Sequence, residues 1–138
     1  MKTPAQPRPE FRNIHITDLR SYRLPPAGIV SILHRISGLG LFLLLPFIVW
    51  IFDRSLSSMS SYEALSAAFS GGTGIVLKII CLGLIWAFLH HLCAGVRHLW
   101  FDATHQVSKE KGHSTALATF AVSIVLTLLL AAKLFGVF

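Results

Sequence analysis

The sequence predicts an all-α membrane protein with three transmembrane helices. Three long apolar stretches follow one another along the chain, separated by short polar segments. Each is long enough to cross a bilayer as a helix, which takes about 20 residues. The composition agrees, because 54% of the 138 residues are hydrophobic and only 13% are charged, which is more apolar than an ordinary soluble domain. The chain is therefore expected to form one integral membrane domain.

The three predicted spans define two parts of the chain. We expect helices over residues 27–52, 74–101 and 114–138, which together form a three-span membrane anchor domain. Residues 1–26 precede the first span as a polar, proline-rich arm. This arm lacks the apolar centre of a secretory signal peptide, so it is expected to stay on the cytoplasmic side as part of the protein.

Lys and Arg residues are distributed unevenly around these spans. The arm carries five, a Ser- and Gly-rich loop at residues 53–72 carries one, and a loop at residues 103–113 carries two. Cytoplasmic segments are enriched in Lys and Arg, so we expect the N-terminus and the second loop to be cytoplasmic. The formal net charge of +6 comes from the flanks of apolar runs and does not form a basic patch, so nucleic-acid binding is not expected.

Two histidines of the second span lie on nearly the same face. His91 and His98 are seven residues apart, which places them about 10 Å apart along a helix axis. Gly95 lies between them on that face, where the missing side chain leaves room for a flat ligand. His90 projects about 100° away from His91, so the two cannot bind the same atom of a cofactor. Because ionisable groups are costly inside a membrane, this face is a candidate cofactor site.

The first span carries polar residues at a similar depth. His34 and Arg35 lie near its cytoplasmic end, and the antiparallel second span brings His91 and His98 to the same layer, about 10 Å below the membrane boundary. Ser31 shares one arc of the first helix with His34 and Arg35. A buried arginine needs an anionic partner or a strong acceptor, and haem propionates and quinone carbonyls both qualify.

Two motifs in these spans resemble those of a known family. Residues 31–38, SILHRISG, resemble the Ser-x-x-His-Arg-x-Ser/Thr-Gly motif of the cytochrome b membrane-anchor subunit of succinate dehydrogenase. Residues 91–102, HLCAGVRHLWFD, resemble its second motif, His-x-x-x-Gly-x-Arg-His-x-x-x-Asp. The resemblance extends from about Arg8 to Phe138, and both motifs stand on the expected helices.

This resemblance implies a subunit of a respiratory enzyme of the tricarboxylic acid cycle. Such an anchor helps electrons pass from succinate, through iron–sulfur clusters, to ubiquinone. It binds one haem b that is shared with a second small three-span anchor subunit, and it holds an iron–sulfur subunit and a flavoprotein subunit at the membrane. The implied location is the bacterial inner (cytoplasmic) membrane, in preference to the mitochondrial inner membrane.

The resemblance also implies a role for each polar residue. His91 matches the axial ligand of the haem iron, and the second axial histidine comes from the partner anchor. His34, Arg35 and His98 match cofactor-binding positions around the haem propionates, and Ser31 with Arg35 matches the quinone-binding positions. No catalytic side chain is expected.

Each of these residues also has a simpler interpretation. His91 could be a core histidine bonded to a backbone carbonyl, and Ser31 could bond the carbonyl four residues before it. His34 and Arg35 could be a helix-end pair that contacts lipid phosphates. His98 could pair with Asp102 one turn later.

Other functions remain open from the sequence. A small transporter could use Arg35 or the histidines as a relay, but it needs charge along its whole path and the third span offers only Lys133. A structural anchor without a cofactor and the anchor of a quinol:fumarate reductase also fit the three-span pattern.

Overall fold

The computed structural model describes residues 17, 22–106 and 108–137, so most of the predicted arm, residues 1–26, lies outside the described part. The described residues form four helices and no strand. Three helices are long and apolar enough to cross a membrane, which confirms the predicted three-span, all-α fold. The helices are α1 (Pro26–Ser57), α2 (Met59–Ala68), α3 (Gly71–Thr104) and α4 (Lys109–Leu134).

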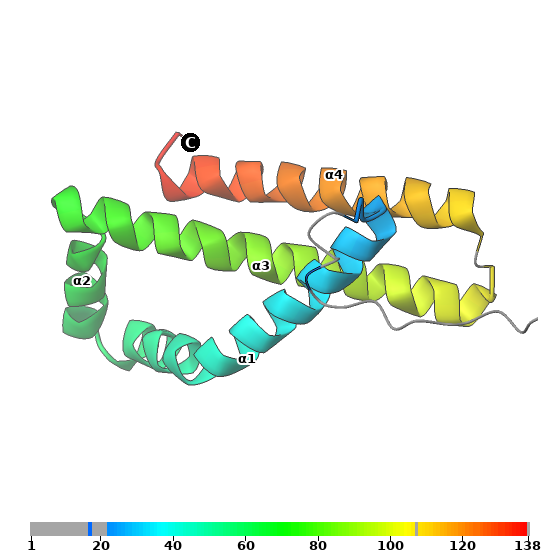
Figure 1. Cartoon of the computed structure of the whole chain (residues 1–138). Helices are drawn as coiled ribbons and strands as arrows, with labels where there is room; N and C mark the ends of the chain where they lie inside the picture. Colours follow the sequence, from blue (N-terminus) through cyan, green and yellow to red (C-terminus); the bar gives the residue numbers. More distant parts are fainter. Residues whose placement is uncertain (1–16, 18–21, 107, 138) are drawn as a thin grey trace, which may run out of the picture.

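The three long helices pack against one another around small side chains. α3 and α4 lie side by side in opposite directions, and α1 crosses them near its own N-terminus (Figure 1). Val30 of α1, Ala94 of α3 and Ala116 of α4 are fully buried where the helices meet, and Ala27 and Phe120 pack against them. Small residues let helix backbones approach closely in a membrane. This contact fixes where the polar residues of α1 and α3 meet.

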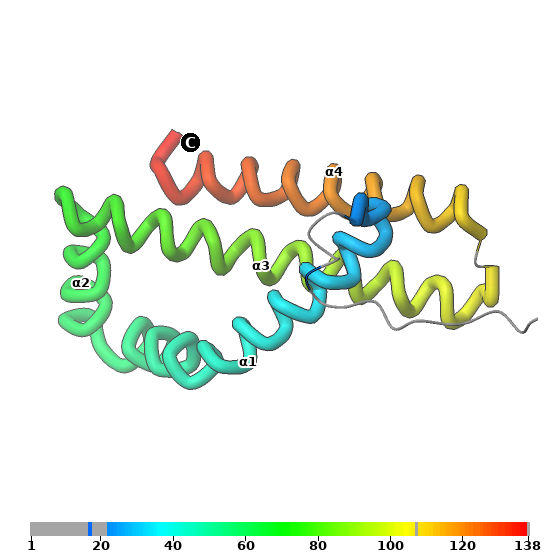
Figure 2. The backbone as a smooth tube through the Cα atoms, viewed as in Figure 1, coloured from blue at the N-terminus to red at the C-terminus, as the bar shows by residue number. Residues whose placement is uncertain are grey.

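Helix α1 begins and bends at prolines. Pro26 is the first helical residue, where the missing N–H costs nothing because the first turn has no partner for it. Pro46 lies inside the helix, and the trace of α1 changes direction in its second half (Figure 2). An internal proline removes a helical hydrogen bond and commonly causes such a bend. The residues around the bend are exposed, as expected for side chains that face lipid or another subunit.

The prediction of an irregular loop over residues 53–72 is wrong, because ten of these residues form α2. Ser58 caps this helix, since its hydroxyl accepts a hydrogen bond from the Ser61 backbone N–H at 3.1 Å. The alanines that follow favour helix. α2 turns tightly into α3, and a Cβ on Gly74 would collide with the Phe69 carbonyl, so only glycine fits there.

The connection between α3 and α4 is also shorter than the loop predicted over residues 103–113. α3 continues to Thr104 and α4 begins at Lys109. Ser108 caps α4 by accepting a hydrogen bond from the Lys111 backbone N–H at 3.2 Å. Both helices extend beyond their apolar stretches into polar residues, and the backbone hydrogen bonds of the helix continue through these residues.

Candidate functional site

The crossing of α1 and α3 brings three histidines together. The rings of His34 and His91 stack with their centroids 4.1 Å apart and their planes 13° from parallel. The ring of His98 lies next to the ring of His34, with 5.1 Å between their centroids. These are three of the four residues predicted to share one layer. The fourth, Arg35, is exposed and makes no hydrogen bond or ion pair with any residue that the structure describes.

The hydrogen bonds of His91 identify which ring nitrogen carries its proton. Nδ1 lies 3.0 Å from the backbone carbonyl oxygen of His34, and a carbonyl oxygen can only accept. Nδ1 therefore carries the hydrogen and donates it. The hydroxyl of Ser37 donates to the same carbonyl at 3.0 Å and lies 3.3 Å from Nδ1. Nε2 then holds a lone pair, and it has no partner among the described residues.

Gly38 allows the His91 ring to lie directly on the backbone of α1. A Cβ at Gly38 would lie 2.7 Å from Cε1 of His91, closer than real Cβ contacts come, and 3.2 Å from Nδ1, which is also tight. Gly95 is different, because a Cβ there would meet Nε2 of His34 at 3.6 Å, an ordinary van der Waals distance. The glycine needed for close approach of the His91 ring therefore lies on α1, and the expectation that Gly95 leaves room for a flat ligand stays a prediction.

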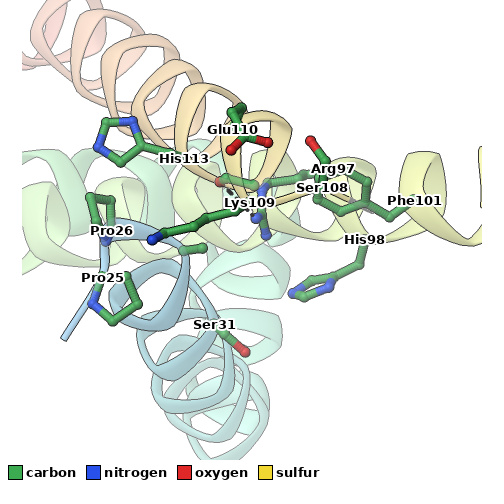
Figure 3. Close-up of a pocket in the computed structure, with 12 residues that line it drawn as sticks. Pro25, Pro26, Ser31, Arg97, His98, Phe101, Ser108, Lys109, Glu110 and His113 are labelled. Atoms are coloured by element: carbon green, nitrogen blue, oxygen red, sulfur yellow. Dashed lines mark hydrogen bonds between the residues drawn. The ribbon is translucent and has the colours of Figure 1, made fainter. Parts of the chain in front are cut away.

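Ser31 and His98 line a cavity of about 890 Å³ at one end of α1, α3 and α4 (Figure 3). Arg35 does not line it, and the arginine in its wall is Arg97 of α3. The residues with polar or charged side chains around this cavity are Ser31, Arg97, His98, Ser108, Lys109, Glu110 and His113. The excess of positive charge suits a ligand with negatively charged or strongly accepting oxygens.

Arg97 joins α3 to the beginning of α4. Its Nε donates to the Thr115 hydroxyl at 3.0 Å and one terminal nitrogen donates to the Gly112 carbonyl at 3.2 Å. Its guanidinium carbon lies 4.8 Å from the centroid of the Phe101 ring. Sequence reasoning alone missed Arg97 as a site residue, although its place in the second motif is a signal that could have found it.

Two further polar residues flank this region, Asp102 at the end of the second motif and His90 directly before it. No hydrogen bond or ion pair joins His98 to Asp102, so the pairing of these two residues is not seen in the structure. His90 is fully buried on a different side of α3 from His91. Its ring stacks against Trp86 and Phe120.

The residues of this site fit a haem iron held by one histidine from this chain. Nδ1 of His91 lies within hydrogen-bond distance of a carbonyl oxygen, and in the neutral ring this leaves Nε2 available, as an axial ligand needs. Within residues 17, 22–106 and 108–137, no three His, Cys, Asp or Glu side chains converge to hold a metal ion. The donors therefore match a cofactor whose own ring supplies the other ligands, better than they match a bare metal ion.

Comparisons with known proteins agree with this geometry. Residues 11–130 match the family described as succinate dehydrogenase/fumarate reductase transmembrane subunit. The succinate dehydrogenase cytochrome b556 subunit of Paracoccus denitrificans is 35% identical over 111 residues, which cover 80% of this chain and 83% of that protein. The subunit of the same name from Coxiella burnetii is 35% identical over 108 residues, covering 78% and 85%.

A relative of related name comes from Reclinomonas americana. Its succinate dehydrogenase cytochrome b560 subunit is 31% identical over 113 residues, which cover 80% of this chain and 78% of that protein. The family match, the relatives and the three apolar helices agree. The chain therefore belongs to the succinate dehydrogenase/fumarate reductase transmembrane subunit family, and within it to the cytochrome b membrane-anchor subunits of succinate dehydrogenase.

Proposed function

We propose that this chain binds haem b through Nε2 of His91 and lines part of the site where succinate dehydrogenase reduces ubiquinone. The observation that carries the proposal is the hydrogen bond from His91 Nδ1 to the His34 carbonyl, which leaves Nε2 free to bind iron. When bound, the haem accepts and donates single electrons. The relatives named as cytochrome b subunits of succinate dehydrogenase favour this function over that of a quinol:fumarate reductase anchor.

The test is a reduced-minus-oxidised optical spectrum of the purified complex. We expect a b-type α-band in a complex that contains this chain and its partner subunits. A complex with full succinate oxidation and no such band would instead support an anchor without a cofactor.

The residues around His91 orient it and hold the charged edge of the haem. The His34 carbonyl and the Ser37 hydroxyl fix the plane of the His91 ring. We assign Arg35, with His34 and His98, to the haem propionates. Charge-assisted hydrogen bonds to a carboxylate are strong, and the Arg35 guanidinium is not engaged by any part of the chain that the structure describes.

Ser31 and Arg35 are the residues we assign to ubiquinone. Ser31 is among the residues that line the cavity at the end of the helices, and Arg35 follows one turn later on α1. A hydroxyl and a guanidinium can both donate to quinone oxygens. They would stabilise the negative charge that develops there as ubiquinone takes up two electrons and two protons.

Replacement of Arg35 with leucine tests the quinone assignment. We expect succinate:quinone reductase activity to fall by roughly 10- to 100-fold. The reason is that the variant loses a charge-assisted hydrogen bond on the order of 2–3 kcal/mol. Succinate oxidation with a soluble dye should change little, because that route does not use the membrane site. Arg35→Lys should restore only part of the activity, since lysine keeps the charge without the planar fork.

Arg54→Leu is the matched control for this experiment. Arg54 is an exposed arginine in the last turn of the same helix, with its guanidinium 5.9 Å from the Trp50 ring. This control should keep normal quinone reduction. Haem content must be measured in both variants, because Arg35 is also assigned to a propionate. Unchanged quinone reduction in Arg35→Leu would contradict the quinone role.

The proposal requires further subunits and a defined membrane. This chain supplies one axial histidine, so the second comes from a partner, which we assign to a second small three-span anchor. An iron–sulfur subunit and a flavoprotein subunit supply the electrons from succinate. We place the complex in the bacterial cytoplasmic membrane, with the N-terminus and the α3–α4 connection on the cytoplasmic side.

Thiol labelling tests this orientation. Single cysteines are introduced at Ser60 of α2 or at Gln106 between α3 and α4, in a chain whose Cys81 and Cys93 are replaced with alanine. Both chosen positions are exposed, and neither is a helix cap. A membrane-impermeant thiol reagent added to intact cells should label position 60 and not position 106. The opposite pattern would place the histidine layer away from the cytoplasmic iron–sulfur subunit.

A further inference from the structure

His90 is a fully buried residue of α3 to which the proposed function assigns no role. It is the largest fully buried side chain among the described residues, and its exposed fraction is 0%. Neither of its ring nitrogens has a hydrogen-bond partner in the described part of the chain. It precedes His91 directly, so any rotation of α3 about its axis moves both rings together.

The His90 ring lies in a slot lined by two aromatic rings. Trp86, one turn earlier in α3, stacks on it with centroids 5.3 Å apart and planes at 24°. Phe120 of α4 stacks on it at 5.4 Å and 28°. The slot therefore has one wall from α3 itself and one from the neighbouring helix α4.

The unpaired nitrogens show that hydrogen bonding does not account for this side chain. A buried polar atom without a partner destabilises the folded protein, and such atoms are rare enough to need an explanation. The feature of His90 that its surroundings do match is its shape, because its flat ring stacks on both Trp86 and Phe120. A branched or tetrahedral side chain of similar size would not stack on these rings in this way.

We infer that His90 is a positioning residue that sets the rotation of α3 and so aims His91 at the haem. This inference rests on the proposed function of His91. The two consecutive histidines join α3 to both of its neighbours. His90 stacks on Phe120 of α4, and His91 lies on Gly38 of α1. Trp86 belongs to α3 and rotates with His90, so the contact with Phe120 is the one that resists rotation of α3.

A haem ligand must be positioned precisely, so even a small rotation of α3 would displace His91 from the iron. Side-chain atoms lie about 6 Å from a helix axis, so a rotation of about 10° moves them by about 1 Å. A ligand site works only if its groups are held to within about 0.5 Å. A slot that resists rotation of α3 therefore controls the position of Nε2 of His91.

Three substitutions of His90 in the assembled complex separate shape from polarity. His90→Phe keeps a flat ring without nitrogens, His90→Asn keeps polar atoms without a ring, and His90→Leu keeps neither. The measurements are the g values of the oxidised haem by electron paramagnetic resonance, and its midpoint potential. We expect Phe to reproduce both wild-type values. We expect Asn and Leu to shift both while haem remains bound.

Phe120 provides an independent test from the α4 wall of the slot. Phe120→Leu opens the slot without changing either histidine, and it should shift the same g values and potential. The control is Ser123→Ala, because Ser123 is fully buried on the same helix and its hydroxyl bonds the Phe120 carbonyl of its own turn. This control should leave both measurements unchanged.

The outcomes separate this inference from the proposed function. Wild-type values in both His90→Leu and Phe120→Leu would overturn the inference and leave haem binding by His91 intact. Wild-type values in His90→Asn together with shifted values in His90→Phe would also overturn it, because the nitrogens would then matter and the shape would not. A wild-type complex without haem would refute the proposed function and this inference with it.

Discussion

Replacing His91 with alanine is expected to remove haem b from the complex, together with its low-spin spectrum. Partners that only orient a metal-binding histidine are worth about 10- to 100-fold in affinity, so loss of the ligand itself should cost more. The His91 ring is also held by the His34 carbonyl and rests on Gly38, so the backbone of α1 sets its position. The measurement is haem content per complex, with the reduced-minus-oxidised spectrum.

His90→Phe is the control for this experiment. It removes both nitrogens of the adjacent histidine and is expected to keep the spectrum, because the ring of His90 stacks on Trp86 and Phe120 and does not face the His91 site. Free imidazole should restore part of the spectrum in His91→Gly, where the ring has been removed. Full haem content in His91→Ala would show that another residue binds the iron.

Gly38→Ala is expected to be the most damaging small substitution in α1. The added methyl group would lie 2.7 Å from Cε1 of His91, so the ring must move. Movement breaks the 3.0 Å hydrogen bond from Nδ1 to the His34 carbonyl and displaces Nε2. Overpacking of this kind costs about 1–3 kcal/mol. We expect a lower thermal midpoint of the purified complex and reduced haem content.

Gly40→Ala makes the same change two residues later in the same helix. No atom lies within 4 Å of a Cβ built at Gly40, so the methyl group meets nothing there. Alanine also favours helix more than glycine does. This variant should be as stable as the wild type or more stable, with full haem content. Equal behaviour of the two variants would show that the contact between Gly38 and His91 is not important.

The sequence determined the number and type of the membrane helices. A bilayer forces each spanning segment to satisfy its backbone hydrogen bonds internally, so a long apolar run is sufficient to predict a helix. The periodicity of a helix likewise placed His91 and His98 near one face and separated His90 from them. These features depend on residues close together in the chain, so they could be read without a structure.

The polar segments between the spans were predicted less well. The segment at residues 53–72 contains many serines, which are common in loops, and its helix α2 depends on the cap formed by Ser58. Propensity is a weak guide in a stretch of this length because packing and caps decide the outcome. For the same reason the predicted connection before α4 is too long.

Only the tertiary structure decided how the motif residues meet. The tertiary structure placed Gly38 against the His91 ring and placed Nδ1 of His91 next to the His34 carbonyl. It also placed Ser31 and Arg97 in the wall of one cavity, whereas Arg35 lies outside that cavity. These outcomes depend on how α1 crosses α3 and on how each helix is rotated. Contacts between distant segments set both quantities, through the close packing of side chains such as Val30, and no local pattern in the sequence encodes them.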